Sequence, residues 1–181
     1  MDIKARAAKI KLLVFDVDGV LTAGQLAIGP NGETMKQFYA QDGLGISAAH
    51  QVGIKTAIIT GRKTEIVKFR GAELKIGDIY QGSVNKVEAM HELAAKHKLA
   101  MDEICYVGDD LNDLAVLLQV GFACAPANAV SEVKERVHYI ASHQGGQGAV
   151  REIIELILKA QGKWQQVIDA YTKPANIETR Q

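Results

Sequence analysis

Short apolar runs alternate with longer amphipathic stretches along this chain, and this alternation predicts its fold. The apolar runs have the length of strands, and nearly continuous apolar character is typical of strands buried on both faces of a parallel sheet. They cover residues 11–15, 55–59, 78–80, 104–107, 121–124 and 138–140. Strands that alternate with helices predict an α/β fold with a doubly wound, Rossmann-like parallel sheet and right-handed crossovers.

The stretches between these runs have helical character. They cover residues 45–51, 64–74, 84–96, 111–120, 130–136 and 149–161. The last is the clearest, because Val150, Ile153, Ile154, Ile157 and Leu158 recur at helical spacing and form one apolar stripe. This stripe predicts a helix that packs one face on the core.

The segment 22–40 interrupts the alternation. Two short alternating runs, 25–28 and 34–39, flank the turn Pro30-Asn31-Gly32, which predicts a β-hairpin inserted after the first strand. The tail 162–181 is mixed and polar, and its apolar positions include Trp164, Val167, Ile168 and Tyr171. We expect one domain over residues 1–181, consisting of the sheet, the hairpin insert and this tail.

Composition narrows the class of protein. The 181 residues suit one domain with a full core, and 48% hydrophobic and 23% charged residues are ordinary values for a globular protein. Because 21 basic residues balance 21 acidic ones, no nucleic-acid or membrane surface is predicted. No apolar run has the length of a membrane helix.

Cysteine usage and the first residues bear on location. Cys105 and Cys124 both fall in apolar runs, which favours buried reduced thiols over a disulfide or a metal pair. Residues 1–9 are charged and poor in apolar side chains, unlike a secretory signal. These features predict a cytoplasmic protein.

Candidate chemistry begins directly after the first strand, in Asp16-Val17-Asp18-Gly19. Open α/β sheets bind ligands at the carboxyl ends of their strands. An aspartate at that edge is a candidate covalent nucleophile, and a second one beside it is a candidate for moving protons. The alternative is a polar loop with a turn glycine.

Later polar groups fall at the same kind of place, a strand end or a helix start. They are Thr60, Gly61 and Arg62 after the second strand, Lys86 at a helix start, and Asp109, Asp110, Asn112 and Asp113 after the strand 104–107. Several such placements in one chain favour a shared site over a solvated surface.

In this order and chemistry, the chain resembles the haloacid dehalogenase superfamily of phosphotransferases. The resemblance rests on the DxDGVLT motif at 16–22, the Thr60-Gly61 strand end, Lys86 and the GDDxxD motif at 108–113, so that it covers roughly residues 12–113. Within the superfamily the chain is most similar to small phosphatases of 3-deoxy-D-manno-octulosonate 8-phosphate, on residues 35–38, 42–46, 80–82 and 145–152.

Two positions depart from that subfamily. Gln41 stands where the subfamily usually has Arg, and Gln147 stands where it often has Lys. Both changes remove a cation, so they bear on the choice of the anionic substrate rather than on the reaction.

The resemblance implies a Mg²⁺-dependent phosphatase that acts on a small phosphorylated sugar acid through an aspartyl-phosphate. It implies that Asp16 is the nucleophile and Asp18 the general acid/base. It also implies that Asp16, the main-chain carbonyl of Asp18 and Asp109 bind Mg²⁺, while Asp113 orders metal-bound water. Oxygen ligands of this kind are those that Mg²⁺ prefers. The alternative for Asp113 is a helix N-terminal carboxylate favoured by the helix dipole.

The remaining candidates hold the phosphoryl group or the substrate. Thr60 offers a hydroxyl and Gly61 an amide to the phosphoryl group. Lys86 is a candidate catalytic residue, because the helix dipole disfavours a cation at a helix start and its presence there favours a functional role. Arg62 and Asn112 are candidates for contacts with an acidic sugar. The alternatives are an ordinary strand residue for Thr60, a solvated surface lysine for Lys86 and a surface salt bridge for Arg62.

Other functions compete with this interpretation. The substrate could instead be a nine-carbon keto-sugar acid phosphate or a hexose phosphate. A signalling receiver module also places acidic residues, Thr and Lys around Mg²⁺, but it accepts phosphate on a middle strand, whereas the DxD pair here follows the first strand. A binding-only relic is disfavoured because Asp16, Asp18, Lys86 and Asp109 are all present.

We also expect a homotetramer. The insert 22–40 is only hairpin-sized, and one helix and one strand fill the interval 60–86, so there is no room for a cap domain over the site. The hairpin residues Leu26, Ile28, Met35 and Phe38 need burial, since an isolated two-stranded hairpin is marginal in water. The resembled subfamily forms tetramers in which neighbouring subunits shield each other's sites. The alternative is a monomer whose hairpin packs on its own sheet.

Overall fold

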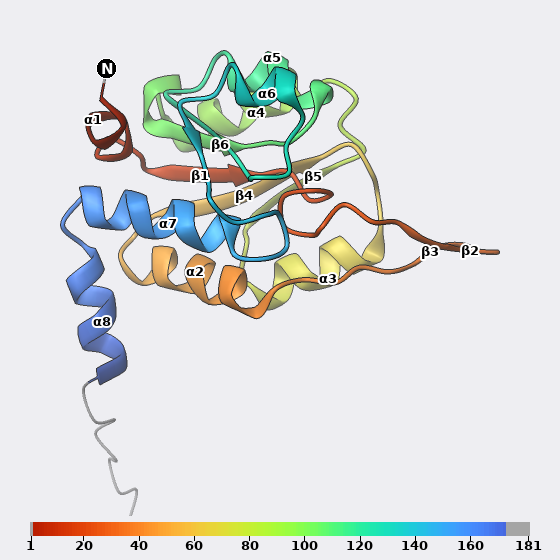
Figure 1. Cartoon of the computed structure of the whole chain (residues 1–181), viewed down its shortest axis with the longest axis horizontal. Helices are drawn as coiled ribbons and strands as arrows, with labels where there is room; N and C mark the ends of the chain where they lie inside the picture. The colour runs from red at the N-terminus through yellow and green to blue at the C-terminus, as the bar shows by residue number, and fades with distance from the viewer. Residues whose placement is uncertain (1, 173–181) are drawn as a thin grey trace, which may run out of the picture.

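Six parallel strands form the central sheet of the computed structural model, which describes residues 2–172 (Figure 1). Their order is β5–β4–β1–β6–β7–β8, and every neighbouring pair is parallel. The strands are β1 (Leu12–Phe15), β4 (Lys55–Thr60), β5 (Asp78–Gln81), β6 (Ile104–Val107), β7 (Phe122–Ala125) and β8 (Tyr139–Ile140). All six predicted strands are confirmed, because strands buried on both faces, such as β1 and β6, leave a continuous apolar run in the sequence.

Helices cover both faces of this sheet (Figure 1). One face packs against α1 (Ile3–Ala7), α2 (Ala40–Gln51), α3 (Glu65–Glu73), α7 (Ala149–Ala160) and α8 (Trp164–Thr172). The other packs against α4 (Lys86–His97), α5 (Leu114–Leu117) and α6 (Ser131–Lys134). The apolar stripe predicted on α7 is buried throughout, which confirms the doubly wound α/β fold.

Helix α2 begins at Ala40, well before the predicted start at Gly45. The sequence is misleading here because glycine is a weak helix former. The helix packs mainly on α7, and a Cβ at Gly45 would lie 3.3 Å from the Cα of Arg151, so this glycine permits the close approach of α7. Asp42 accepts a hydrogen bond from the backbone N–H of Arg151, at the start of α7, at 2.8 Å. Contacts between helices therefore fix this helix start.

The predicted helix over 111–120 is confirmed only in part. The chain forms a 3₁₀ turn, η2 (Leu111–Asp113), and then only the short α5. The Asp113 carboxylate accepts the backbone N–H groups of Asp109 at 2.9 Å and Asp110 at 3.3 Å, and this contact tightens the first turn. Another 3₁₀ turn, η1 (Met101–Glu103), precedes β6.

The two ends of the described chain are helical, which the sequence did not predict. Helix α1 precedes β1, and α8 begins in the predicted tail. Val167 of α8 is buried against the core, whereas the other apolar positions of this helix are at least partly exposed. The rest of the predicted tail, residues 173–181, lies outside the described residues.

The predicted hairpin is confirmed as β2 (Ala27–Gly29) and β3 (Gly32–Met35), a separate antiparallel pair that projects from the body of the protein (Figure 1). Leu26, Ile28 and Met35 are 43%, 60% and 52% exposed. Phe38 differs from the prediction, because it packs against the core of its own subunit, with the guanidinium of Arg70 5.6 Å from its ring centre. The hairpin therefore presents a smaller apolar surface than the sequence indicates.

The structure also bears on the cysteines and on the apolar character of the helices. Cys105 and Cys124 are free and buried, with their sulfur atoms 3.7 Å apart. In residues 2–172, no helix has both the length and the apolar character needed to cross a bilayer.

Candidate active site

A pocket of about 220 Å³ lies at the carboxyl ends of β1, β4 and β6. It holds most of the site residues predicted from the sequence. Its lining residues are Asp16, Asp18, Gly24, Thr60, Gly61, Arg62, Asp109, Asp110 and Asn112. The two remaining candidates, Lys86 and Asp113, contact the site from the protein interior. The strand-end placement expected from the sequence is therefore present.

Beneath the pocket lies a buried polar group that we call the floor cluster, formed by Asp16, Lys86, Tyr106 and Asp113. Lys86 Nζ donates to Asp16 Oδ2 and to Asp113 Oδ1, each at 2.7 Å. Lys86 is only 4% exposed, so the alternative of a solvated surface lysine is wrong. Because Lys86 opens α4, where the helix dipole disfavours a cation, its position depends on these two carboxylates.

Asp113 organises the floor cluster rather than the surface of a helix. It is fully buried, and its Oδ1 accepts a second hydrogen bond from the Tyr106 hydroxyl at 2.6 Å. Its Oδ2 accepts the two backbone N–H groups that tighten the η2 turn. With both oxygens occupied by donors, Asp113 holds the loop that carries Asp109. Tyr106 was not predicted as a site residue, because it lies in an apolar strand with no polar neighbour that marks it.

The electrostatics of the pocket favour a cation. Burial and the neighbouring Asp113 raise the pKa of Asp16, against the opposing effect of Lys86. Burial, Asp113 and Asp16 raise the pKa of Asp109 to about 7. Burial alone would lower the pKa of Lys86, but its two carboxylate partners outweigh burial and raise it. One lysine thus faces three close carboxylates, which leaves an excess of negative charge.

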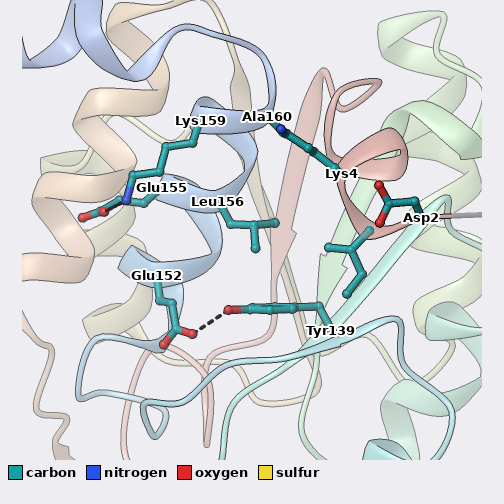
Figure 2. Close-up of a pocket in the computed structure, with 9 residues that line it drawn as sticks. Asp2, Lys4, Tyr139, Glu152, Glu155, Leu156, Lys159 and Ala160 are labelled. Carbon is teal, nitrogen blue, oxygen red and sulfur yellow. Dashed lines mark hydrogen bonds and ion pairs between the residues drawn. The ribbon is translucent and has the colours of Figure 1, made fainter.

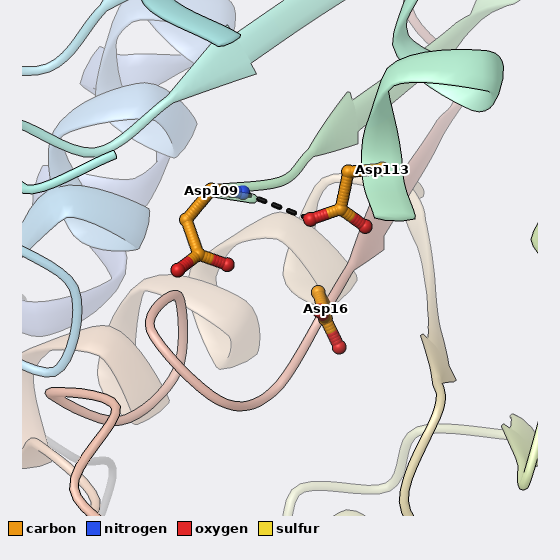
Figure 3. Close-up of side chains that lie close together, drawn as sticks. All are labelled: Asp16, Asp109 and Asp113. Carbon is orange, nitrogen blue, oxygen red and sulfur yellow. Dashed lines mark hydrogen bonds between the residues drawn. The ribbon is translucent and has the colours of Figure 1, made fainter. Parts of the chain in front are cut away.

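Asp16 and Asp109 lie close enough to share a metal ion, with Asp113 beside them (Figure 3). One oxygen each from Asp16, Asp109 and Asp113 lie within 4.8 Å of one another. Asp109 Oδ1 is buried and accepts no hydrogen bond within residues 2–172. Gly19 has a φ of +88°, and a Cβ there would lie 1.9 Å from Asp109 Oδ2, so only glycine permits this approach. These hard oxygen donors fit a magnesium ion.

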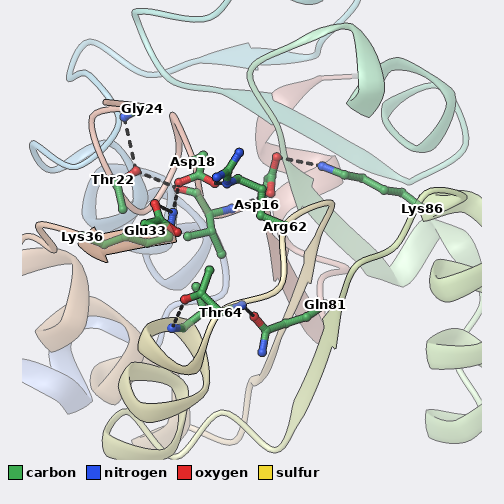
Figure 4. A network of polar contacts seen from close by, with 12 residues as sticks. Asp16, Asp18, Thr22, Gly24, Glu33, Lys36, Arg62, Thr64, Gln81 and Lys86 are labelled. Carbon is green, nitrogen blue, oxygen red and sulfur yellow. Dashed lines mark hydrogen bonds and ion pairs between the residues drawn. The ribbon is translucent and has the colours of Figure 1, made fainter. Parts of the chain in front are cut away.

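At the side of the pocket lies a second buried group, which we call the rim cluster, formed by Asp18, Glu33 and Lys36 (Figure 4). Lys36 Nζ contacts Asp18 Oδ1 and donates to Glu33 Oε1 at 2.7 Å. The Lys36 side chain is 1% exposed. Sequence reasoning missed Lys36, because a lysine in a predicted hairpin has no signal that separates it from a solvated one.

The remaining candidates surround the opening of the pocket. Thr60 is buried at the end of β4, and Gly61 follows it into the pocket lining. Arg62 lines the pocket, and its Nε lies 3.9 Å from Asp18 Oδ2, with 45% of the Arg62 side chain exposed. Asn112 is exposed and lines the pocket.

A larger cavity of about 610 Å³ lies elsewhere, between α1, β8 and α7 (Figure 2). Its polar groups are engaged with one another. The Tyr139 hydroxyl donates to Glu152 at 2.6 Å, and Lys159 pairs with Glu155 at 2.8 Å. Its three carboxylates face two lysines, and among the described residues the only group of three close carboxylates is Asp16, Asp109 and Asp113 at the smaller pocket, which is therefore the candidate active site.

Comparisons with known proteins agree with this location. Residues 65–154 match the family model of haloacid dehalogenase-like hydrolases. The chain is 46% identical over 162 residues to the 3-deoxy-D-manno-octulosonate 8-phosphate phosphatase KdsC of Escherichia coli strain B, a match that covers 90% of this chain and 86% of that relative.

Solved structures are similar over nearly the whole chain. A probable YrbI family phosphatase from Pseudomonas syringae has a TM-score of 0.93 at 44% identity, covering 96% of this chain and 98% of that one. The 3-deoxy-D-manno-octulosonate 8-phosphate phosphatase from Moraxella catarrhalis has a TM-score of 0.90 at 41% identity, covering 93% and 97%. That enzyme was solved in complex with a magnesium ion, a phosphate ion and a KDO molecule.

Proposed function

This chain belongs to the haloacid dehalogenase-like hydrolases, and from that premise we propose that it hydrolyses 3-deoxy-D-manno-octulosonate 8-phosphate to the free sugar acid and phosphate. It is a phosphatase, a phosphoric monoester hydrolase, and its family excludes the receiver-module alternative. The observation that carries the substrate proposal is the pairing of Asp16 and Asp18 over a metal-fitting set of carboxylates, in a chain 46% identical to a phosphatase of that sugar acid.

In the proposed first step, a carboxylate oxygen of Asp16 attacks phosphorus. The bond between phosphorus and the ester oxygen breaks, and Asp18 gives its proton to that leaving oxygen. An aspartyl-phosphate on Asp16 results. The backbone N–H of Val17 donates to Asp16 Oδ1 at 2.6 Å, and Lys86 holds Oδ2, so that the nucleophile is fixed in orientation before it reacts.

In the second step, water attacks phosphorus, Asp18 takes a proton from that water, and the bond from phosphorus to Asp16 breaks. Phosphate leaves, and both aspartates return to their starting protonation states. Asp18 thus serves as the acid and then as the base, a role for which a positioned carboxyl typically supplies about 10²–10⁴ in rate.

Asp16, Asp109 and the main-chain carbonyl of Asp18 would hold a magnesium ion, with Asp113 holding the Asp109 loop in place. When bound, the ion neutralises the repulsion between a carboxylate nucleophile and a phosphate dianion. The Thr60 hydroxyl and the Gly61 amide donate to the transferring phosphoryl oxygens, in the manner of an oxyanion hole.

The pocket volume bears on the substrate. About 220 Å³ accommodates a phosphoryl group and the carbons next to it, so that the rest of an eight-carbon acid extends past the opening, where Arg62 and Asn112 lie. Gln41 and Gln147 carry no charge, so neither supplies a cation at the pocket opening. Gln41 is exposed, and Gln147 lines a separate cavity beside the hairpin. Arg62 is therefore the proposed contact for the sugar carboxylate, and a nine-carbon keto-sugar acid phosphate is the second candidate substrate.

A comparison of substrates tests this proposal. Phosphate release with Mg²⁺ would be measured for p-nitrophenyl phosphate, for several hexose phosphates and for the eight- and nine-carbon sugar acid phosphates. We expect the highest kcat/KM for the eight-carbon ester. A higher kcat/KM for another ester would identify that ester as the better candidate substrate. The absence of any turnover would contradict the assigned site.

We propose a homotetramer, which is supported by the exposed Leu26, Ile28 and Met35 on the projecting hairpin and by an active site without a cap domain in residues 2–172. Light scattering coupled to size-exclusion chromatography should give a mass near four chains, and a mass near one chain at micromolar protein would contradict the proposal. Leu26→Asp with Ile28→Asp should dissociate the assembly. Leu118→Asp, at an exposed position of another element, is the matched control.

The cytoplasmic location and the single domain over 1–181 are kept as proposals. The free, buried thiols of Cys105 and Cys124 support the location, since proteins of reducing compartments keep thiols unpaired. Recovery of the protein in an exported fraction of fractionated cells would contradict it.

A further inference from the structure

We propose that Lys36, carried by the hairpin, is a positioning residue for the departure of the leaving group. It anchors one carboxylate oxygen of Asp18, so that the other oxygen is held toward the pocket. This inference rests on the proposed role of Asp18 as the proton donor.

The two oxygens of Asp18 have different surroundings (Figure 4). Oδ1 is bound by Lys36 Nζ. Oδ2 is buried and accepts no hydrogen bond within the described residues, and its nearest cation is Arg62, whose Nε lies 3.9 Å away. Because Asp18 lines the pocket, its uncommitted oxygen is the one that can serve a bound ester. The geometry thus divides the carboxylate into an anchored oxygen and a working oxygen.

Lys36 is not an ordinary surface ion pair. Its side chain is 1% exposed, and its second partner, Glu33, is 5% exposed. Burying a charge is costly unless partners offset the loss of water, and here two carboxylates do so. The pair between Lys68 and Glu65, with side chains 66% and 84% exposed, is of the surface type that contributes little. The protein therefore buries a lysine at the one place where it contacts Asp18.

The hairpin geometry accounts for how Lys36 reaches Asp18. Strand β3 ends at Met35, so Lys36 leaves the hairpin directly toward the body of the protein. Glu33 precedes it by three residues and binds the same ammonium. The residues that line the 220 Å³ pocket, all within the described chain, do not include Lys36. Its contact is with Asp18, and a direct phosphate contact is not indicated.

The test compares an ester whose leaving group needs a proton with one whose leaving group does not. The alkoxide of 3-deoxy-D-manno-octulosonate 8-phosphate needs protonation, whereas p-nitrophenolate leaves without it. The kcat/KM is the proper measure, since it ends with the first irreversible step, the departure of the leaving group. Lys36→Met should lower kcat/KM about 100-fold for the sugar ester, and less than about 10-fold for p-nitrophenyl phosphate.

Lys36→Arg keeps a cation and should recover much of the activity toward the sugar ester. Lys68→Met removes an exposed lysine from α3 and should leave kcat/KM unchanged for both esters. Should the eight-carbon ester prove not to be a substrate, the best alkyl phosphate among those tested takes its place. A failed substrate proposal is thereby separated from a failed role for Lys36.

Equal losses for the two esters, or no loss for either, would overturn the proposal. The activity toward p-nitrophenyl phosphate also reports whether Lys36→Met is folded. If that variant does not fold, Glu33→Gln combined with Lys36→Met removes one charge of each sign, and the same selective loss is expected. An unselective loss in the double variant would be equally decisive against the proposal.

Discussion

The floor cluster and the rim cluster place the same motif on two different scaffolds. Each buries a lysine between two carboxylates: Lys86 with Asp16 and Asp113 in the floor, and Lys36 with Asp18 and Glu33 in the rim. The floor is built from the ends of β1 and β6 and the start of α4. The rim takes two of its three members from a hairpin that pairs with no strand of the main sheet.

This difference separates the two halves of the chemistry. The proposed nucleophile, Asp16, directly follows β1, which pairs with β4 and β6 in the main sheet. The proposed proton donor, Asp18, is held by Lys36 at the end of the hairpin, an element that is marginal in isolation. The attack on phosphorus should therefore tolerate changes in the hairpin, whereas protonation of the leaving group should be sensitive to them.

The largest expected loss of activity comes from a change in the floor cluster, Asp16→Asn. This substitution keeps the shape of the side chain, but its amide cannot form an acyl-phosphate. The variant should fold and lose essentially all turnover for both aryl and alkyl esters. Asp18→Asn should be severely impaired for the alkyl ester. Steady-state phosphate release measures both variants. A retained kcat above about 1% of wild type in Asp16→Asn would be inconsistent with a nucleophile.

A smaller effect distinguishes two carboxylates of the same loop. Activity should vanish with a chelator and return with Mg²⁺, and Asp109→Ala should weaken Mg²⁺ binding more than Asp113→Ala, since Asp109 Oδ1 is the uncommitted oxygen. Asp113→Ala should instead lower the free energy of unfolding by roughly 3–5 kcal/mol, because Lys86 and Tyr106 each lose the buried carboxylate to which they donate a hydrogen bond.

Magnesium titration of activity and urea unfolding separate these two effects. Full activity of metal-stripped protein would contradict the metal assignment. The reverse ranking of the two alanine variants would instead exchange the roles of Asp109 and Asp113.

The smallest expected effect concerns Glu152, which lies outside both clusters and holds a neighbouring loop segment. Glu152 accepts hydrogen bonds from the Tyr139 hydroxyl at 2.6 Å, the Ser142 backbone N–H at 2.9 Å and His143. This contact holds the segment that leads into the loop 144–148, which packs on the loop after Asp18. Burial alone would raise the pKa of Glu152, but these hydrogen bonds outweigh burial and lower it from 4.5 to about 2.

Because the folded pKa of Glu152 lies below the unfolded value, its stabilising effect is complete above pH 4.5 and is lost as the pH falls toward about 2. Glu152→Gln should therefore lower the free energy of unfolding at neutral pH, and its difference from wild type should shrink below pH 4.5. Urea unfolding across this range measures it. A difference that does not change with pH would show that the charge of Glu152 is not what stabilises the segment.

The sheet and most of the site were predictable from the sequence because each signal is local. A strand buried on both faces is apolar throughout, and Asp16, Thr60 and Asp109 stand next to such strands. Lys36 and Tyr106 were not predictable as site residues, since a lysine in a hairpin and a tyrosine in an apolar strand show no local sign of their contacts with Asp18 and Asp113. The start of α2 was missed for a similar reason, because Gly43 and Gly45 weaken its helix propensity, and the contacts with α7 that offset them cannot be read from the sequence.

The central claim is that the phosphoryl group passes through Asp16, and the stereochemical course at phosphorus tests it most directly. A phosphorothioate ester made chiral with oxygen isotopes would be hydrolysed in isotopically labelled water, and the configuration of the thiophosphate product determined. Two in-line displacements, first by Asp16 and then by water, predict net retention of configuration. Net inversion would mean that water attacks the ester in a single displacement, and it would contradict the account.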